Sequence, residues 1–396
     1  MKTDNEKQVK RRIARRFYRA LGTVFALILA ALFLLNIVLP DREMSLQEKR
    51  VLKSFPAPEM SRVLEGEYSD EFEAYASDQI PFRNAFTRIK VFWDRLLGKD
   101  ESQGVYRGKD GYLIERMDRP DLERVSVTLE AAAAFADAQA AETLMVLVPN
   151  AVSVCEDKLP ALAPSEDQKA FVSFVGEKLA GSRVSLLDLS PTLKQLKEKD
   201  EERPLYYRTD HHWTTYAAEG CASRVMEALG RTFAAGQKLV PVSFGFTGSL
   251  AAKSGFGTGV TDEIDLWVPD REPLYLVTGR EGKKATLYDP EKLKGSDPYQ
   301  VFLGGNEGYL HIETDGFGKG RLLVFKDSYF NCFLPFLLDA YETIDVIDPR
   351  YYDGELSGQL LQNEYDQVLF FYNINTFSRD SALSLILREA GYGPGF

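Results

Sequence analysis

The stretch Arg208-Thr209-Asp210-His211-His212-Trp213 holds two of the three histidines of the 396-residue chain, the third being His311. Histidine is the side chain whose ordinary pKa allows proton exchange near neutral pH, and a neighbouring carboxylate can fix its tautomer. Asp210 and His212 therefore predict an orienting acid and a general base that still need a nucleophile. A hydrogen-bonded corner, or part of a zinc site, is an alternative interpretation of the same residues; we expect no metal and no cofactor.

A serine at the end of a predicted strand is the candidate nucleophile. The run Arg321–Phe325 predicts a buried strand, and Asp327-Ser328 follows it. Catalytic groups of open α/β sheets gather at the carboxyl ends of strands, where the free amides of a following helix can hold a developing negative charge. Ser328 would be activated there, with a helix-capping serine as the alternative.

Two further polar residues follow other predicted strands at the same edge. Asn375 comes after the strand 367–372, and a side-chain amide is a suitable donor to an oxyanion. Arg350 comes after the strand 343–347 and could bind a substrate carboxylate. A turn asparagine and a surface salt bridge are the respective alternatives.

The pattern around these residues predicts an α/β fold, because strands alternate with helices of 10–15 residues, as in a parallel sheet with helices on its faces. A β-rich insertion at about 235–320 interrupts the pattern near the site, with strands at 240–246, 274–277 and 284–288, and His311 within it is expected to be structural. The main strands that we expect are 143–148, 183–189, 321–325, 343–347 and 367–372, and the main helices are 125–141, 165–180, 331–340 and 355–364.

The amino terminus combines a basic tail with an apolar run. Residues 1–19 carry eight Lys or Arg against two acidic residues, and residues 20–39 are almost entirely apolar. Twenty helical residues span about 30 Å, the thickness of a bilayer core, and the basic flank predicts a cytoplasmic amino terminus. The exit Ile37-Val38-Leu39-Pro40 has no small-residue cleavage site. We expect an uncleaved single-pass anchor in the cell membrane with the catalytic domain outside.

Composition limits the remaining possibilities. The chain has a net charge of −11 despite its basic tail, which argues against a nucleic-acid partner. Three cysteines, Cys155, Cys221 and Cys332, lie in apolar surroundings and predict core positions rather than a disulfide framework. The domain organisation that we expect is a cytoplasmic tail at 1–19, an anchor at 20–39, a helical stalk at 41–102 and a catalytic domain at 103–396.

The sequence resembles the DHHW family, named for the motif that stands here as Asp210-His211-His212-Trp213. That family is similar to the alginate O-acetyltransferase proteins, which carry a circularly permuted SGNH-hydrolase-like domain. The resemblance extends from about Phe55 to the end of the chain. Its blocks occur in the family's order at Asp78–Arg83, Gly104–Leu113, Val148–Leu159, Lys326–Tyr329, Asp348–Tyr351 and Asn373–Phe377.

The resemblance implies a role for individual residues. Asp210, His212 and Ser328 match the family's triad, and Asn373-Ile374-Asn375 matches the Gly-x-Asn block of SGNH enzymes, which gives Asn375 as the oxyanion donor and leaves Asn373 as the second candidate. Two positions depart from the pattern, because Lys326 and Asn373 stand where the family has glycine.

These implications predict an O-acyltransferase, most simply an O-acetyltransferase, that acylates an extracellular or cell-wall glycan through an ester of Ser328. A membrane-bound O-acyltransferase is the partner expected to supply the acyl group. A carbohydrate esterase with the same triad is one alternative function. A non-catalytic, membrane-tethered glycan-binding scaffold is another.

Overall fold

The computed structural model divides the chain into two compact units, Met1–Leu97 and Gly98–Phe396. The helix predicted at 355–364 lies almost entirely outside the residues that the structure describes. Those residues are 2–42, 44–45, 50–56, 67–233, 237–257, 259–270, 274–279, 282, 285–315, 318–354, 356 and 364–394.

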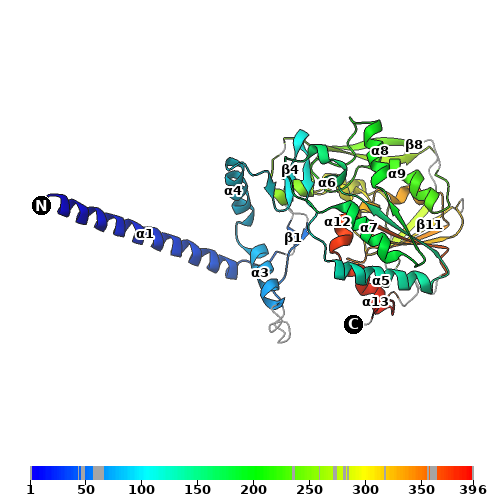
Figure 1. Cartoon of the computed structure of the whole chain (residues 1–396), viewed down its shortest axis with the longest axis horizontal. Helices are drawn as coiled ribbons and strands as arrows, with labels where there is room; N and C mark the ends of the chain where they lie inside the picture. The colour runs from blue at the N-terminus through cyan, green and yellow to red at the C-terminus, as the bar shows by residue number, and fades with distance from the viewer. Residues whose placement is uncertain are drawn as a thin grey trace. The chain divides into compact units, whose positions relative to one another are not determined.

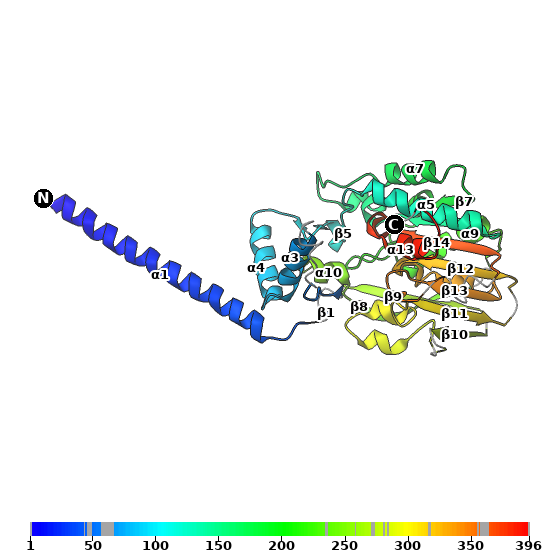
Figure 2. The same ribbon diagram turned by 90° about the horizontal axis from the view of Figure 1, so that it is seen from below.

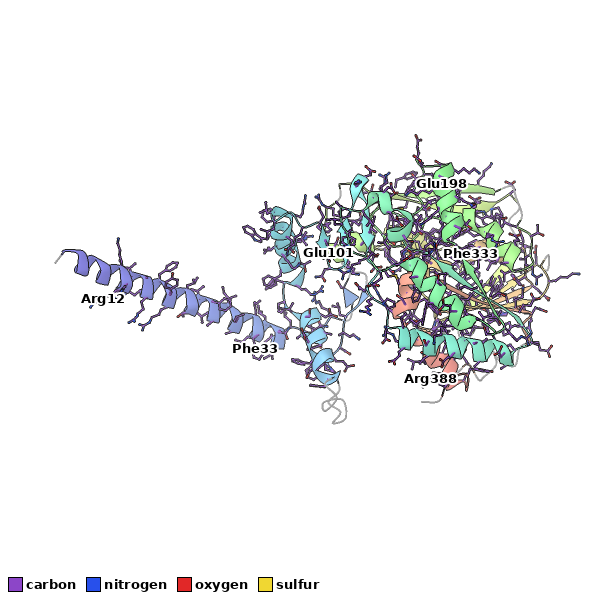
Figure 3. All side chains as sticks on the ribbon, in the orientation of Figure 1. Arg12, Phe33, Glu101, Glu198, Phe333 and Arg388 are labelled. Carbon is purple, nitrogen blue, oxygen red and sulfur yellow. The ribbon has the colours of Figure 1, made fainter. Side chains whose placement is uncertain are left out.

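The amino-terminal unit begins with one long helix, α1 (Lys2–Val38), which contains both the basic tail and the apolar run. Its segment Lys10–Val38 is long and apolar enough to cross a membrane, and none of its most apolar window is buried. Arg12 and Phe33 mark its basic and apolar parts (Figure 3). The rest of the described unit consists of β1 (Met44–Ser45), β2 (Arg50–Val51), α3 (Glu67–Gln79) and α4 (Arg83–Leu96).

The second unit is built on a seven-stranded sheet with the strand order β10-β11-β13-β12-β14-β6-β7. The five strands from β13 to β7 are parallel, which confirms the predicted α/β fold. Figure 2 shows β14, β12, β13, β11 and β10 side by side. The strands are β6 (Glu142–Val148), β7 (Val184–Asp188), β10 (Tyr275–Gly279), β11 (Tyr309–Thr314), β12 (Arg321–Lys326), β13 (Thr343–Ile347) and β14 (Gln367–Asn373).

Both faces of the sheet are covered, because every residue of the central strand β14 is buried. Successive side chains point to opposite faces, so Phe370 and Phe371 pack in different layers. Phe370 contacts Phe135 of α5, and Phe371 contacts Trp213. Helices α5, α7 and α13 therefore lie on one face, and α8 and α9 lie on the other (Figure 1). These helices are α5 (Leu122–Ala138), α7 (Gln168–Leu179), α8 (Ser190–Lys199), α9 (Thr215–Ala228) and α13 (Ala382–Glu389).

The prediction of a regular helix at 331–340 is wrong. The segment instead forms short 3-10 turns, Ser328–Phe330 and Leu334–Leu337. Pro335 has no N–H for an α-helical hydrogen bond, and a 3-10 helix aligns side chains three residues apart. Phe330, Phe333 and Phe336 follow that spacing and are all buried. Phe333 stands in the interior of the unit (Figure 3).

The segment 237–315 contributes to the main sheet as well as forming a hairpin of its own. Its strands β8 (Gln237–Phe246) and β9 (Asp262–Pro269) pair with each other, whereas β10 and β11 extend the main sheet as antiparallel strands. The strand predicted at 284–288 is not formed over its described residues, where Tyr288 makes only an isolated bridge to Phe302. His311 in β11 is hydrogen-bonded to Asp345 of β13 at 2.8 Å, in keeping with a structural residue.

A small sheet lies beside the Arg208–Trp213 stretch. The predicted hairpin is present as β4 (Val105–Arg107) and β5 (Leu113–Glu115), with Lys109–Gly111 in its turn and β3 (Glu101–Ser102) at its edge. The N–H of Leu113 donates to the carbonyl of Arg208 at 2.7 Å. The three cysteines are free and buried, as the sequence predicts.

Candidate active site

Ser328 stands immediately after β12, at the carboxyl edge of the sheet. Asp327 fixes this turn, because its carboxylate accepts hydrogen bonds from the N–H groups of Tyr329 (2.9 Å) and Asn373 (2.8 Å). The second bond joins the turn after β12 to the end of the neighbouring strand β14. The side chain of Ser328 is therefore held at the edge where the sequence places it, and the residue is 8% exposed.

Asp210, His212 and Ser328 form one hydrogen-bonded chain. The His212 Nδ1 lies 2.6 Å from Asp210 Oδ1, and the His212 Nε2 lies 2.8 Å from Ser328 Oγ. An ionised carboxylate can only accept, so Nδ1 carries the proton and Nε2 is left to accept from the serine hydroxyl. This is the arrangement in which an imidazole can remove the proton of an attacking hydroxyl.

Burial and neighbouring charges determine the ionisation states of Asp210 and His212. Burial, followed by the nearby His211, lowers the pKa of His212 from 6.5 to about 4, although Asp210 acts in the opposite direction. Burial would raise the pKa of Asp210, but the two histidines and the N–H of Ser249 outweigh it and hold that pKa well below its ordinary value. At neutral pH the acid is therefore ionised and the imidazole is neutral, as a general base requires.

A third carboxylate holds the loop that carries Asp210. Asp262 of β9 accepts from the N–H of Arg208 at 2.7 Å, and from the N–H and hydroxyl of Thr209 at 2.8 and 2.6 Å. The loop would otherwise bury three unpaired donors, which is costly. Asp262 thus positions Asp210 from 52 residues away. The sequence analysis missed this residue, and no spacing within the chain marks it.

Gly248 allows the backbone to approach Asp210 closely. The N–H of Gly248 donates to Thr209 Oγ1 at 2.9 Å, and the N–H of Ser249 donates to Asp210 Oδ2 at 2.7 Å. A Cβ at Gly248 would lie 2.2 Å from Asp210 Cβ and 2.6 Å from its Oδ2. Only glycine therefore fits against the carboxylate without a shift.

Aromatic rings fix the orientation of His212. Tyr299 stacks on the imidazole with ring centroids 3.7 Å apart and an angle of 10°, and His211 covers it at 3.8 Å. The Tyr299 hydroxyl donates to the carbonyl of Ser328 at 3.1 Å. The indole of Trp213 donates to the carbonyl of Tyr329 at 2.9 Å. Trp213, the residue after His212, thus forms a hydrogen bond to the turn that contains Ser328.

His211 faces away from the serine. Its Nδ1 lies 2.7 Å from Ser249 Oγ, and its side chain is 32% exposed against 7% for that of His212. Asp210, His211 and His212 each offer one ligand atom within 4.8 Å of the others, a spacing that could hold a metal ion. Both ring nitrogens of His212 already have partners, however, so metal binding there would break the bond to Asp210 or Ser328. The donor set suits proton transfer better than metal binding.

Asn375 is the second residue of α12 (Ile374–Arg379), the helix that directly follows β14. Its Oδ1 accepts from Gln168 Nε2 at 3.3 Å, and its Nδ2 lies 3.5 Å from Glu115 Oε2. Gln168 therefore fixes the amide so that its nitrogen is the donor on the other side. Among the described residues, the backbone N–H of Ser328 has no acceptor.

Asn373, unlike Asn375, is the N-cap residue of α12. Its Oδ1 caps α12 by accepting from the N–H groups of Asn375 and Thr376, and it also accepts from Asn150 Nδ2 at 3.0 Å. Its φ of −71° is an ordinary extended value, so no left-handed conformation demands glycine at this position. Asn150, which follows β6, was missed as a candidate, although it directly follows Pro149 at a strand end.

Arg350 and Lys326 share one buried carboxylate. Arg350 contacts both oxygens of Asp348, through Nε at 2.8 Å and Nη2 at 2.7 Å. Lys326 Nζ donates to Asp348 Oδ2 and to Asn331 Oδ1, both at 2.9 Å. The departure from the family's glycine at Lys326 is therefore accommodated by an internal ion pair. Arg350 keeps 24% of its side chain exposed.

A charged group borders the site at Glu115, the last residue of β5. Glu115 lies 2.8 Å from Lys253 Nζ and 3.7 Å from Arg379 Nη1, and both cations are 40% exposed. Burial would raise the pKa of Glu115, but Lys253 and His211 outweigh it and lower the value. The carboxylate beside Asn375 is thus ionised and is paired with two accessible cations. The sequence analysis placed the hairpin but not this group.

Part of the second unit is similar in sequence to acetyltransferase proteins. Residues 105–254 match the family described as the SGNH hydrolase-like domain of acetyltransferase AlgX. The chain is 22% identical over 174 residues to the probable alginate O-acetylase AlgJ of Pseudomonas fluorescens. That alignment covers 42% of this chain and spans less than half of the relative, 44%.

Two solved structures share the fold. A DHHW family protein from Eubacterium siraeum is 20% identical, with a TM-score of 0.61, and the match covers 72% of this chain and 95% of that one. Bacillus cereus PatB1 with a sulfonyl adduct is 18% identical, with a TM-score of 0.57 over 69% of this chain and 96% of that one. The resemblance to DHHW proteins is confirmed, and the second unit has an SGNH-hydrolase-like fold.

Proposed function

We propose that this protein is a membrane-anchored O-acetyltransferase that transfers an acetyl group to a hydroxyl of an extracellular or cell-wall glycan. The observation that carries the proposal is the hydrogen-bonded chain from Asp210 through His212 to Ser328. The likeness to the AlgX domain family and to an alginate O-acetylase supports the choice of acyl group and the class of acceptor.

In the first half-reaction, Ser328 Oγ attacks the carbonyl carbon of an acetyl donor. His212 Nε2 takes the hydroxyl proton as the new C–O bond forms, and Asp210 stabilises the imidazolium through Nδ1. The intermediate then collapses, and His212 returns the proton to the leaving group. Ser328 is left as an acetyl ester.

In the second half-reaction, a glycan hydroxyl attacks the ester carbonyl. His212 Nε2 accepts the proton of that hydroxyl, and the intermediate expels Ser328 Oγ, which recovers a proton from His212. Glu115, Lys253 and Arg379 could hold a hydroxyl-rich acceptor, because they combine hydrogen-bond acceptors and donors at the border of the site.

Negative charge develops on the carbonyl oxygen in both halves. We assign the backbone N–H of Ser328 and the amide of Asn375 as its donors, because the first has no acceptor among the described residues and the second is oriented by Gln168. Asn373 serves as the cap of α12 in this assignment. Arg350 supports the site electrostatically and can bind an anionic part of a substrate.

The same residues can also hydrolyse esters, so the acceptor decides between transferase and esterase. We infer that the acyl donor is supplied by a membrane-bound O-acyltransferase, because α1 would keep the catalytic unit beside the membrane across which the acyl group must pass. The amino terminus would then be cytoplasmic and the catalytic unit extracellular.

The test uses the full chain in nanodiscs with a chromogenic acetyl ester and a series of oligosaccharides. We expect a sulfonyl fluoride to modify Ser328, and mass spectrometry to find acetylated oligosaccharide. Ser328→Ala should lose both results while keeping its thermal midpoint. Ester hydrolysis undiminished by every acceptor, with no acetylated product, would favour the esterase.

Ser190→Ala is the matched control. Ser190 also stands between a sheet strand and a helix, but its hydroxyl bonds to Asp188 at 2.6 Å and to no histidine. It should keep both labelling and transfer. If the folded wild-type chain were not labelled at Ser328, the acyl-enzyme mechanism would be wrong and a non-catalytic scaffold would become the better interpretation.

A further inference from the structure

Helix α4 carries an apolar face that no described element of the amino-terminal unit covers. The side chains on its packed side are Val91 and Asp94, both buried, and Thr87, which is half-buried. The opposite side is apolar and solvent-exposed. We call this side the apolar stripe; its members are Phe82, Phe86, Ile89, Trp93 and Leu96, between 45% and 64% exposed.

The spacing of the stripe is helical. Its members follow one another at intervals of four and three residues. Phe82 is the N-cap residue, and the four members within the helix lie in an arc of about 80° at 3.6 residues per turn. Phe92 widens the stripe on one side and is 59% exposed. Five adjacent exposed apolar side chains on one helix face are unusual for a surface in contact with water alone. The stripe therefore indicates a contact with an apolar phase.

The remaining surface of α4 is basic. Arg88 and Arg95 flank the stripe on one side and Lys90 on the other, and Asp94 is the one acidic residue of the helix. Lys90, whose side chain is 58% exposed, forms an ion pair at 2.8 Å with Asp94 of the packed side. An amphipathic helix with aromatic side chains on one face and Lys or Arg at its flanks suits the boundary between acyl chains and anionic headgroups.

Hydrogen bonds connect the end of α3, which directly precedes α4, to the end of α1 and the residues after it. Asn36, in the last turn of α1, donates through Nδ2 to the carbonyl of Gln79 at 3.1 Å. Gln79 then exchanges hydrogen bonds with the backbone of Arg42, through Oε1 and Nε2, both at 3.0 Å. Arg42 Nη2 also donates to the carbonyl of Asp78 at 2.8 Å. The end of α3 thus holds the first residues after α1, and the short segment 80–82 leads from it into α4.

We propose that α4 lies in the outer interface of the membrane that α1 crosses, with the apolar stripe in the acyl-chain region and its arginines at the headgroups. The proposal rests on the proposed membrane anchor. The bilayer is the occupant that the observations favour, because the stripe begins three residues after Gln79, whose hydrogen bonds hold the end of α3 at the exit of α1. Such a contact would limit how far the catalytic unit moves from the membrane surface.

Trp93 is a built-in reporter of this contact. The chain has three tryptophans, of which Trp213 and Trp267 are 0% and 3% exposed and Trp93 is 59% exposed. The full chain would be reconstituted into phosphatidylcholine–phosphatidylglycerol vesicles with and without lipids brominated on the acyl chains. We expect the brominated lipid to reduce the Trp93-dependent emission, measured against Trp93→Phe, by about half or more.

Two variants make the test specific. Phe86→Ser combined with Ile89→Ser should remove most of the quenching, because it breaks the apolar stripe. Phe244→Ser, which changes a side chain 74% exposed on the β8–β9 hairpin, should leave the quenching unchanged.

Vesicle flotation separates the possible failures. A chain that floats with the vesicles but whose Trp93 emission ignores the brominated lipid would overturn the docking of α4 and leave the anchor intact. A chain that does not float would overturn both the anchor and the docking. Acetyl transfer measured on the same preparation reports the enzymatic proposal independently of either result.

Discussion

Gly248→Ala is expected to disable the site without touching any residue of the triad. The backbone of Gly248 has a φ of −89° and a ψ of −174°, which alanine adopts readily, so no conformational strain is involved. The added methyl group would instead lie 2.2 Å from Asp210 Cβ, 2.5 Å from its Cα and 2.6 Å from its Oδ2. Non-bonded carbons prefer about 3.5–4.0 Å, so the two segments must separate by about 1 Å or more.

That movement acts on the bond between Asp210 and His212. The Asp210 Oδ1 to His212 Nδ1 distance is 2.6 Å, and an added ångström would take it beyond hydrogen-bond range. A misplacement of 1 Å in a catalytic group can cost about 100-fold in rate, and complete loss of the orienting acid costs about 10,000-fold in a serine triad. We therefore expect the acylation rate to fall by between about 100-fold and 10,000-fold. Overpacking of this kind typically costs about 1–3 kcal/mol of folding free energy.

The assay is single-turnover acylation by a chromogenic acetyl ester, with a thermal melt of each variant in parallel. Gly257→Ala is the control, because a Cβ at Gly257 has no atom within 4 Å. It should acylate like the wild type. Equal acylation rates for Gly248→Ala and Gly257→Ala would refute the argument that the Gly248 contact positions the acid.

Two further predictions concern the base and the oxyanion donor. Because the pKa of His212 lies below 6.5, at about 4, acylation should be lost only as the pH falls well below 6.5, and a rate profile with its midpoint at or above 6.5 would contradict this. Between pH 6.5 and 4 the unfolded chain binds a proton at this histidine, whereas the folded chain does not. The free energy of unfolding should therefore decrease as the pH falls through this range, by up to about 1.4 kcal/mol per pH unit. His212→Gln should remove that part of the pH dependence. Asn375→Ala should lower turnover by about 100-fold to 1,000-fold. Its effect in chemical denaturation should be smaller than that of Asn373→Gly, because Asn373→Gly costs a few tenths of a kcal/mol at the cap of α12 and also removes the acceptor of the buried Asn150 amide, a loss of about 1–3 kcal/mol. If Asn373→Gly lowered turnover more than Asn375→Ala at equal stability, the donor assignment would be reversed.

The sequence by itself determined the class of fold and the residues of the candidate triad. Apolar runs such as 367–372 have to be buried on both faces, and a parallel sheet covered by helices is the structure that buries them. The sequence has three histidines, and two of them lie beside Asp210. It also places Asp327-Ser328 directly after a predicted strand. Few other residues could therefore pair as a proton-accepting base and a nucleophile. The candidate membrane span could likewise be predicted from the sequence, because length and hydropathy are local properties.

The tertiary structure alone decided how the triad is supported. Asp262 and Gly248 contact the Arg208–Asp210 loop from 38 or more positions further along the chain, and neither belongs to a periodic or motif pattern. The structure also made Asn373 a helix cap and replaced the predicted helix at 331–340 with 3-10 turns around buried phenylalanines. The physical reason is the same in each case. Periodicity records which side of an element is buried, whereas hydrogen-bond partners and close approaches depend on which distant segments the packed sheet brings together.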